Sequence, residues 1–259
     1  MLLTVHGLVR EERVFLRSFQ KLAAVCDWVS AVSRPVLEEV LEVEPALSGR
    51  VSLVANGMCR HPGEPPRPGF DPPILLMVGR LSREKGFDVG LQAFARLRRR
   101  VPAARLEIAG DGDERQALEQ QAADLEVAEA VRFLGWVQPQ KVFELYDRAS
   151  VVLVPSRYEG FGLVALEAAQ RARPVVASRV GGLGEVVVDG LTGSLTPPEQ
   201  PGALARALLA LVRDPERAQR MGRAGRARAL AEFSLEATVR GYDDLYRHIV
   251  GQRAICGEA

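Results

Sequence analysis

The chain has 259 residues, enough for one large domain or two modest ones. Hydrophobic residues make up 47% and charged residues 26%, the balance of a globular protein that buries a core. Lys and Arg number 34 against 33 Asp and Glu, so no global electric field exists to hold nucleic acid or an anionic membrane. The apolar start of the chain and the apolar stretch 203–212 are both short, so we expect no signal peptide and no transmembrane segment. Three widely spaced cysteines, Cys26, Cys59 and Cys256, indicate reduced thiols in a cytoplasmic protein.

Short β-branched apolar runs alternate with longer amphipathic segments along the chain. This alternation is typical of a parallel sheet with crossover helices. Residues 87–100 illustrate the helices, with apolar residues at the spacing of one buried face and an arginine-rich end. The predicted fold class is therefore α/β, with a doubly wound, Rossmann-like parallel sheet. The predicted strands are 2–6, 28–33, 51–56, 73–79, 105–110, 131–136, 151–156, 174–179 and 193–197.

A proline- and glycine-rich segment, residues 59–72, excludes helix and sheet interior alike and is the predicted linker between two domains. The strand–helix units of residues 73–233 suffice for a complete doubly wound domain. Residues 1–58 hold fewer strands and form a partial domain, as though the chain began part-way through one. A last helix over residues 234–250 opens with Ser234 as its N-cap.

The sequence GRLSREKGF, residues 79–87, follows a predicted strand at the position where open parallel sheets bind ligands. Arg80 stands at the strand end, and Lys85 and Gly86 come just before the next helix. Two cations, a glycine that lets a ligand approach the backbone, and free N–H groups at a helix terminus outline a diphosphate site. Solvated loop cations are the alternative, which these residues alone leave open.

The sequence EGFGLVALEA, residues 159–168, carries two acids around a Gly-Phe-Gly step. Within one helix the two acids would be turned about 80° apart and separated by about 12 Å, so they would not share a target. With Glu159 on the loop and Glu167 on the following helix, one extended ligand could offer its hydroxyl groups to both. The alternative is a helix-start acid and a solvated one. A similar loop, VGGLGE, ends at Glu185 and is equally compatible with a tight connection.

Together with LEIAGDGDERQALE, VRFLGWV and ALARALLALVRDPE, these stretches resemble the donor-binding half of a GT-B retaining glycosyltransferase of the group 1, or family 4, type. The specific motif is E-x7-E enclosing G-F-G, with G-R-L-x3-K-G upstream, and the resemblance covers roughly residues 51–250. It implies transfer of a sugar from a nucleotide-diphosphate sugar with retention at the anomeric carbon, without a cofactor or a metal. The D-x-D at residues 111–113 matches a structural turn of the family.

By position, the resemblance implies that Arg80 and Lys85, next to Gly79, hold the nucleotide diphosphate and stabilise it as it leaves. Glu159 would face the donor sugar, and Glu167 would accept the ribose hydroxyls. Further donor contacts are implied for Val137 beside the base, for the backbone of Gly160, Phe161, Gly162 and Leu163, and for Glu185.

The amino-terminal segment also fits the resemblance. TVHG resembles the acceptor-domain strand whose histidine lies near the reacting sugar, so His6 is the candidate catalytic or donor-positioning histidine. In the turn that holds Glu185, Gly184 replaces the proline of the usual G-G-x-P-E pattern. Relatives carry a longer segment before the histidine, including a glycine-rich loop, so we expect an amino-terminally truncated chain. Helix 234–250 is expected to cross back to the amino-terminal part.

The leading hypothesis is a hexosyltransferase-like glycosyltransferase acting on a nucleotide sugar, in the cytoplasm or at the inner face of the membrane. Its acceptor is left open among lipid-linked, polysaccharide and small-molecule classes. The alternative is a non-catalytic or split nucleotide-sugar-binding module, for which a partner chain supplies the missing part. An epimerase of the same fold is disfavoured by the E-x7-E block. We expect Glu159→Ala and Lys85→Ala to weaken donor binding and Glu199→Ala, in a proline-rich loop, to leave it unchanged.

Overall fold

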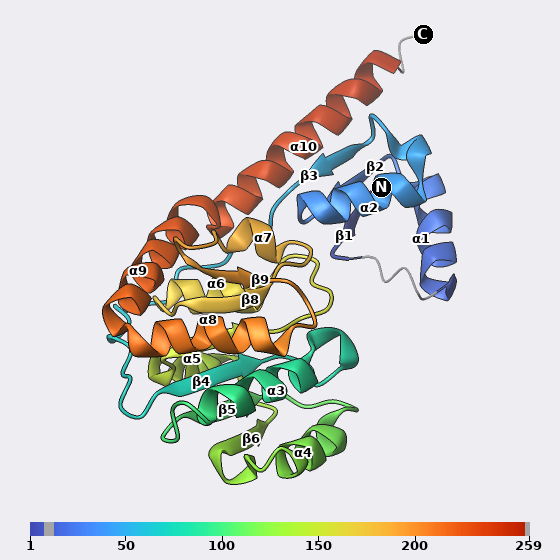
Figure 1. Ribbon diagram of the computed structural model, residues 1–259. Helices are drawn as coiled ribbons and strands as arrows, with labels where there is room; N and C mark the ends of the chain where they lie inside the picture. The colour runs from blue at the N-terminus through green and yellow to red at the C-terminus, as the bar shows by residue number, and fades with distance from the viewer. Residues whose placement is uncertain (8–12, 257–259) are drawn as a thin grey trace. The chain divides into compact units, whose positions relative to one another are not determined.

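The computed structural model describes the backbone of residues 1–7 and 13–256 (Figure 1). The chain divides into two compact units. One unit comprises residues 1–60 together with the chain from residue 231, and the other comprises residues 61–230. No described helix has the length and apolar character needed to cross a membrane. Neither Cys26 nor Cys59 forms a disulfide, and the side chain of Cys256 lies outside the described part.

The first unit is built on parallel strands in the order β1-β2-β3. The predicted strand 51–56 is shorter than expected, because its pairing with β2 ends where Ala31 lies opposite Leu53. The last helix of the chain packs here, with Leu245 buried beside Trp28 and Val54. The elements are β1 (Leu2–Val5), α1 (Arg13–Val25), β2 (Trp28–Ala31), α2 (Arg34–Val43), β3 (Val51–Leu53) and α10 (Leu235–Cys256).

Helix α10 begins as the sequence predicts. The Ser234 Oγ accepts a hydrogen bond from the Ala237 N–H at 3.1 Å, which satisfies one of the donors that a helix start leaves unpaired. Thr238 donates its hydroxyl to the Ala55 carbonyl at 2.8 Å, and the Thr4 and Tyr242 hydroxyls lie 3.2 Å apart. These bonds join the carboxyl-terminal helix to the amino-terminal sheet within one unit.

The second unit is a six-stranded parallel sheet in the order β6-β5-β4-β7-β8-β9 (Figure 1). All six strands predicted for this region are present. Its strands are β4 (Ile74–Val78), β5 (Arg105–Ala109), β6 (Val131–Gly135), β7 (Val151–Val154), β8 (Val175–Ser178) and β9 (Gly193–Thr196). Its helices are α3 (Phe87–Arg98), α4 (Arg115–Asp124), α5 (Pro139–Arg148), α6 (Leu163–Gln170), α7 (Leu183–Val186), α8 (Pro201–Arg213) and α9 (Pro215–Glu232).

Both faces of this sheet are covered, which is why its strands read as nearly continuous apolar runs. Leu75 and Met77 of β4 point into a core shared with α3, α4 and α8. The intervening Leu76 is also fully buried, and α5 and α6 contact the central strands β4 and β7. The basic helix α9 buries a stripe of small residues and Met221, and leaves most of its arginines in solvent.

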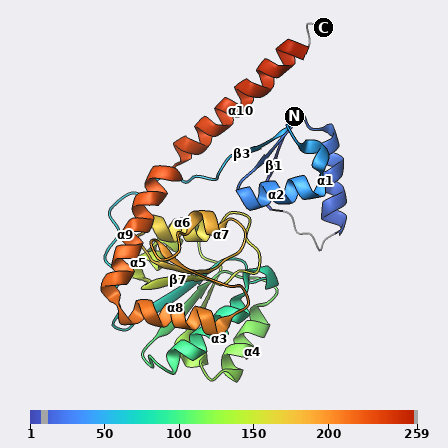
Figure 2. The same cartoon turned by 45° about the horizontal axis from the view of Figure 1, so that its top comes forward.

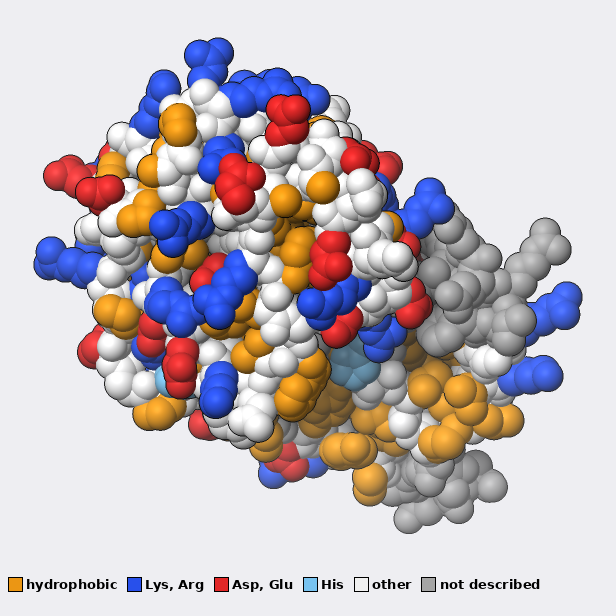
Figure 3. All heavy atoms as spheres, turned by 90° about the horizontal axis from the view of Figure 1, so that it is seen from below, with side chains coloured by type: hydrophobic (Ala, Val, Ile, Leu, Met, Phe, Trp, Pro, Cys, Tyr) orange, Lys and Arg blue, Asp and Glu red, His pale blue; other side chains and the backbone are white. Residues whose placement is uncertain are grey.

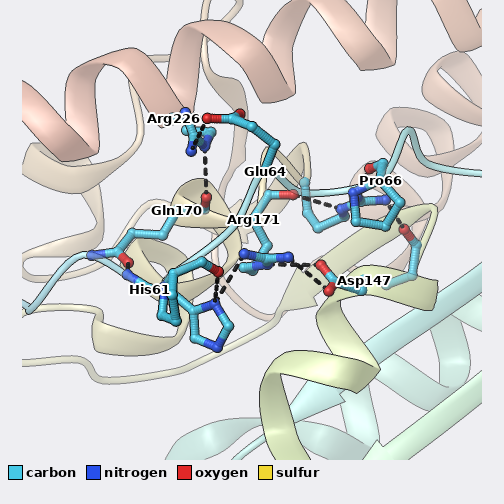
Figure 4. A network of polar contacts seen from close by, with 10 residues as sticks. His61, Glu64, Pro66, Asp147, Gln170, Arg171 and Arg226 are labelled. Atoms are coloured by element: carbon cyan, nitrogen blue, oxygen red, sulfur yellow. Dashed lines mark hydrogen bonds and ion pairs between the residues drawn. The ribbon is translucent and has the colours of Figure 1, made fainter.

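The proline-rich segment is hydrogen-bonded along the second unit (Figure 4). Arg173, which is fully buried, donates to the carbonyls of Arg171, Ala149 and Pro66. Burial lowers the pKa of Arg173 to about 10. Arg171 forms a two-pronged ion pair with Asp147, with both N···O distances at 2.7 Å. Through Pro66, and through His61 beside the Arg171 guanidinium, these two buried arginines attach the proline-rich segment to the second unit.

Candidate active site

The strand order places a topological switch point between β4 and β7. The chain leaves β4 toward β5 on one side, and β7 occupies the other side. Ligands of open α/β sheets bind outside the carboxyl ends of the strands at such a point. The loops after β4 and β7 are in direct contact there, because the Arg157 N–H donates to the Glu84 carbonyl at 2.8 Å.

These two loops bring together two of the residues singled out from the sequence. The Lys85 Nζ lies 3.0 Å from the Glu159 Oε2, and the two side chains are 26% and 15% exposed. The Ser156 hydroxyl also donates to the same carboxylate oxygen, at 3.4 Å. An ammonium and a carboxylate therefore meet at the switch point, where solvent still reaches both.

Gly86 permits the close approach of the two loops. It lies between a short 3-10 turn, Arg83–Lys85, and α3, with φ of +64°. A Cβ at this position would lie 2.2 Å from the Pro155 carbonyl oxygen, so only glycine fits. Lys85 is thereby held one residue from the helix start and directed toward the loop that follows β7.

Arg157 ties the two loops together and was not identified from the sequence. Its guanidinium donates to both carboxylate oxygens of Asp88 at 2.7 and 2.8 Å, to the Arg83 carbonyl at 2.8 Å and to Glu199 at 2.9 Å. Burial alone would raise the pKa of Asp88, but the hydrogen bonds and charge of Arg157 outweigh it and lower that pKa. Because Glu199 is bonded to Arg157, it is a poor control residue for the donor-binding variants. Glu216, whose side chain is 90% exposed, is a better control.

Arg80 and Val137 line one pocket of about 310 Å³ at the carboxyl ends of β4, β5 and β6. Gly79 and the exposed Trp136 line the same pocket. The Arg80 side chain is exposed, with no polar partner within the described chain. Arg80, which the sequence predicts to hold the diphosphate, and Val137, predicted to lie beside the base, therefore line the same pocket.

The Gly-Phe-Gly step begins α6. Gly160, Phe161 and Gly162 are buried, Leu163 is the first residue of the helix, and its side chain is exposed. The loop after β8 packs directly on this step, because the Gly182 N–H donates to the Glu159 carbonyl at 3.0 Å. A Cβ at Gly181 would lie 1.8 Å from that same carbonyl oxygen.

Glu185 lies in the short helix α7, which follows that loop, and its side chain is half-buried. The Arg228 guanidinium of α9 donates to the Glu185 and Val186 carbonyls at 2.7 and 2.8 Å. At Gly184, where the family pattern has proline, a Cβ would meet no atom within 4 Å. The departure from the family pattern is therefore at an open position, and the turn is held by α9.

Glu167 has a buried partner that sequence reasoning missed. The Tyr146 hydroxyl, on α5, donates to the Glu167 Oε2 at 2.6 Å. Burial raises the pKa of the Glu167 carboxyl, and the hydrogen bond only partly opposes that rise. Burial, and then the Glu167 charge, raise the pKa of the Tyr146 hydroxyl well above its usual range. Keeping the Glu167 carboxylate ionised in this buried position lowers the free energy of unfolding, and such unfavourable burial is typical of functional groups.

Glu167→Gln is therefore expected to increase the free energy of unfolding near pH 7. A carboxyl whose pKa is raised in the folded state lowers the free energy of unfolding of the protein as pH rises above the unfolded pKa of about 4.3. The gain should shrink toward zero as the pH approaches about 4, where wild-type Glu167 is protonated. Urea denaturation across this range checks it, with Glu216→Gln as control. A variant that loses stability throughout would contradict this assignment.

His6 follows β1 at its carboxyl end and is exposed. It belongs to the first unit, whereas the residues described above belong to the second. Its assignment as a catalytic or donor-positioning residue stays a prediction.

Residues 64–228 match the family model for glycosyl transferases group 1. The chain belongs to this family. Among curated relatives of this glycosyltransferase, glycogen synthase of Mycobacterium tuberculosis H37Rv is 37% identical over 222 residues, which are 85% of this chain and 54% of the relative. D-inositol 3-phosphate glycosyltransferase of Frankia alni is 37% identical over 268 residues, covering 96% of this chain and 63% of the relative. The chain thus spans less than two thirds of the length of these two curated relatives.

Solved structures agree on the fold. Sucrose-phosphate synthase from Thermosynechococcus elongatus superposes with a TM-score of 0.85 at 30% identity, covering 97% of this chain and 68% of that one. Anabaena HepE in complex with UDP and glucose also has a TM-score of 0.85, at 21% identity, covering 95% of this chain and 71% of that one. The α/β, Rossmann-like fold predicted from the sequence is confirmed as the GT-B type.

Proposed function

We propose that this group 1 glycosyltransferase chain binds a nucleotide-diphosphate sugar at the β4/β7 switch point and transfers the sugar with retention at the anomeric carbon. The observation that carries the proposal is the pairing of the Lys85 Nζ with the Glu159 Oε2 at 3.0 Å, where the two loops meet. A cation for a diphosphate and an acid for sugar hydroxyls lie side by side, as a single donor molecule requires.

The Lys85–Glu159 pair is suited to being exchanged for a ligand. A partly exposed ion pair contributes about 1 kcal/mol or less. A hydrogen bond to a charged group contributes about 1.5–3 kcal/mol, so a diphosphate can replace Glu159 as the partner of Lys85. Glu159 is then released to accept hydrogen bonds from the donor sugar, without leaving the site.

The departing diphosphate is stabilised by fixed positive groups in this mechanism. Lys85, clamped by the Arg157 loop contacts, and Arg80, which has no competing partner in the described chain, face the charge that develops as the sugar leaves. The N–H groups at the starts of α3 and α6 add to them. These donors let the chain act without a metal, and Glu167 accepts the ribose hydroxyls of the donor.

A panel of nucleotide sugars tests this proposal. UDP-, ADP- and GDP-glucose are added to the wild-type chain, and unfolding is followed by thermal shift. One of them should stabilise the protein by about 2.7 kcal/mol at 100 times its dissociation constant. Glu159→Ala and Lys85→Ala should reduce that shift, and Glu216→Ala should not. An equal shift in all variants would refute the site. Binding with no release of the nucleoside diphosphate when lipid-linked, polysaccharide and small-molecule acceptors are supplied would indicate a binding module.

A further inference from the structure

A groove of about 470 Å³ lies between α3 and α8 and has an entirely basic rim. The two helices pack side by side in both ribbon views (Figures 1 and 2). Its lining includes Arg96 of α3, Arg100 in the turn just after α3, and Arg206 and Arg213 of α8, and no acidic residue of the described chain lines it. The volume falls within the range of small-molecule sites. Basic side chains are numerous in the space-filling view from below (Figure 3).

These four arginines are exposed and lack partners. Within the described part of the chain, none of their guanidiniums forms an ion pair or a hydrogen bond. Arg98, on the same helix, shows the contrast, because it pairs with Glu129. Four like charges around one groove repel one another, and they create a local positive potential on a chain whose net charge is only +1. An anion in the groove relieves that repulsion.

Two of the guanidiniums converge above one glycine. A Cβ at Gly202 would lie 3.5 Å from the Arg96 Nη1 and 3.6 Å from the Arg206 Nη1. Because glycine has no side chain, the space between the two guanidiniums stays open. Gly202 lies in the first turn of α8, where Pro201 has no N–H and the Ala203 and Leu204 N–H groups donate to the Gln200 carbonyl. The two planar guanidinium forks on either side of this open space, rather than the helix start, form the phosphate-binding arrangement.

The floor of the groove is apolar. Leu97 and Ala205 are buried beneath the arginines, and Leu209 is half-buried beside them. A bare inorganic ion does not use such a floor, whereas a phosphate carried on a sugar or another ring places the ring against it. We propose that this groove is a second ligand site, which binds a small phosphorylated molecule.

The groove is separate from the candidate donor site. It takes in the carboxyl-terminal end of α3, and Lys85 and Gly86 precede the amino-terminal end of the same helix. A helix of 12 residues is about 18 Å long. One small ligand therefore does not reach both sites, and binding at the groove does not depend on the proposed function.

Isothermal titration calorimetry with sodium tripolyphosphate tests the groove. The titrated protein is the full chain with Lys85→Ala, a substitution that weakens the candidate donor site. One tripolyphosphate ion per chain should then bind, at the groove. Adding Arg96→Ser and Arg206→Ser should weaken that binding at least tenfold. Adding Arg217→Ser and Arg220→Ser instead removes the same charge from exposed positions of α9 and should change the affinity less than twofold. Circular dichroism and the melting temperature check that every variant is folded.

Three outcomes would overturn the proposal. They are no tripolyphosphate binding in the Lys85→Ala chain, unchanged binding in the Arg96→Ser/Arg206→Ser variant, and an equal loss in the α9 control. Binding to vesicles of phosphatidylcholine with one part in three of phosphatidylglycerol distinguishes a lipid surface from a small phosphorylated molecule as the ligand. Vesicle binding that requires Arg96 and Arg206, without tripolyphosphate binding, would assign the groove to a membrane instead.

Discussion

Lys85→Ala is expected to lower the rate of sugar transfer by about 10²- to 10³-fold, the usual effect of removing one fixed donor from a developing negative charge. The Lys85 ammonium is held beside Glu159 by a loop that Gly86 and Arg157 anchor, so no neighbouring cation moves easily into its place. Release of the nucleoside diphosphate from the donor that the panel selects, with the sugar passing to a supplied acceptor or to water, measures the effect.

Lys141→Ala is the matched control for this prediction. Lys141 is an exposed lysine of α5 to which the site assigns no role, so its loss removes the same charge without removing a site residue. Its rate should stay within about twofold of wild type. If Lys85→Ala and Lys141→Ala were equally active, Lys85 would have no role in stabilising the leaving group.

Arg173→Met is expected to cost about 3 kcal/mol of unfolding free energy. Arg173 is fully buried and donates to three backbone carbonyls, those of Arg171, Ala149 and Pro66. Methionine fills part of the space but donates nothing, so the carbonyls lose their partner, at about 1–3 kcal/mol for each buried group left unsatisfied. Relief of the buried charge offsets part of the loss. Urea denaturation measures the difference.

Arg179→Met is the comparison for Arg173. Arg179 forms an ion pair with Asp189 in which its side chain is 57% exposed, so its loss should change stability by less than about 0.5 kcal/mol. If Arg173→Met were as harmless as Arg179→Met, the proline-rich segment would not depend on the buried guanidinium. The unfolding transition of Arg173→Met should also begin at a lower urea concentration, because residues 61–72 lose an attachment to the sheet.

The sequence predicted the sheet well because its signals are local. Apolar runs bounded by turn residues mark each strand, and all nine predicted strands are present in the described chain. Strand ends were less certain, because pairing stops where the neighbouring strand stops, as at Leu53. The rule that ligands bind at the carboxyl ends of parallel strands led us to expect Lys85 and Glu159 near one ligand, but their direct ion pair was not predicted.

The partners of the site residues could not be predicted in the same way. Tyr146 bonds Glu167 across two helices, and nothing in the surrounding sequence marks that tyrosine as buried. Arg157 lies in the same loop as Glu159 but reads as one more solvated arginine until Asp88 is seen beside it. Arg171 and Arg173 are buried although arginine is mostly exposed in proteins. The burial and the partners of these residues depend on packing between segments that are far apart in the sequence, which local sequence patterns do not encode.

A structure of the protein with the selected nucleoside diphosphate bound would show whether Lys85 and Arg80 hold the diphosphate. We expect phosphate oxygens within hydrogen-bond distance of the Lys85 Nζ and the Arg80 guanidinium, with the ribose hydroxyls on the Glu167 carboxylate. A nucleotide bound away from the loops after β4 and β7, with Lys85 still paired to Glu159, would contradict it.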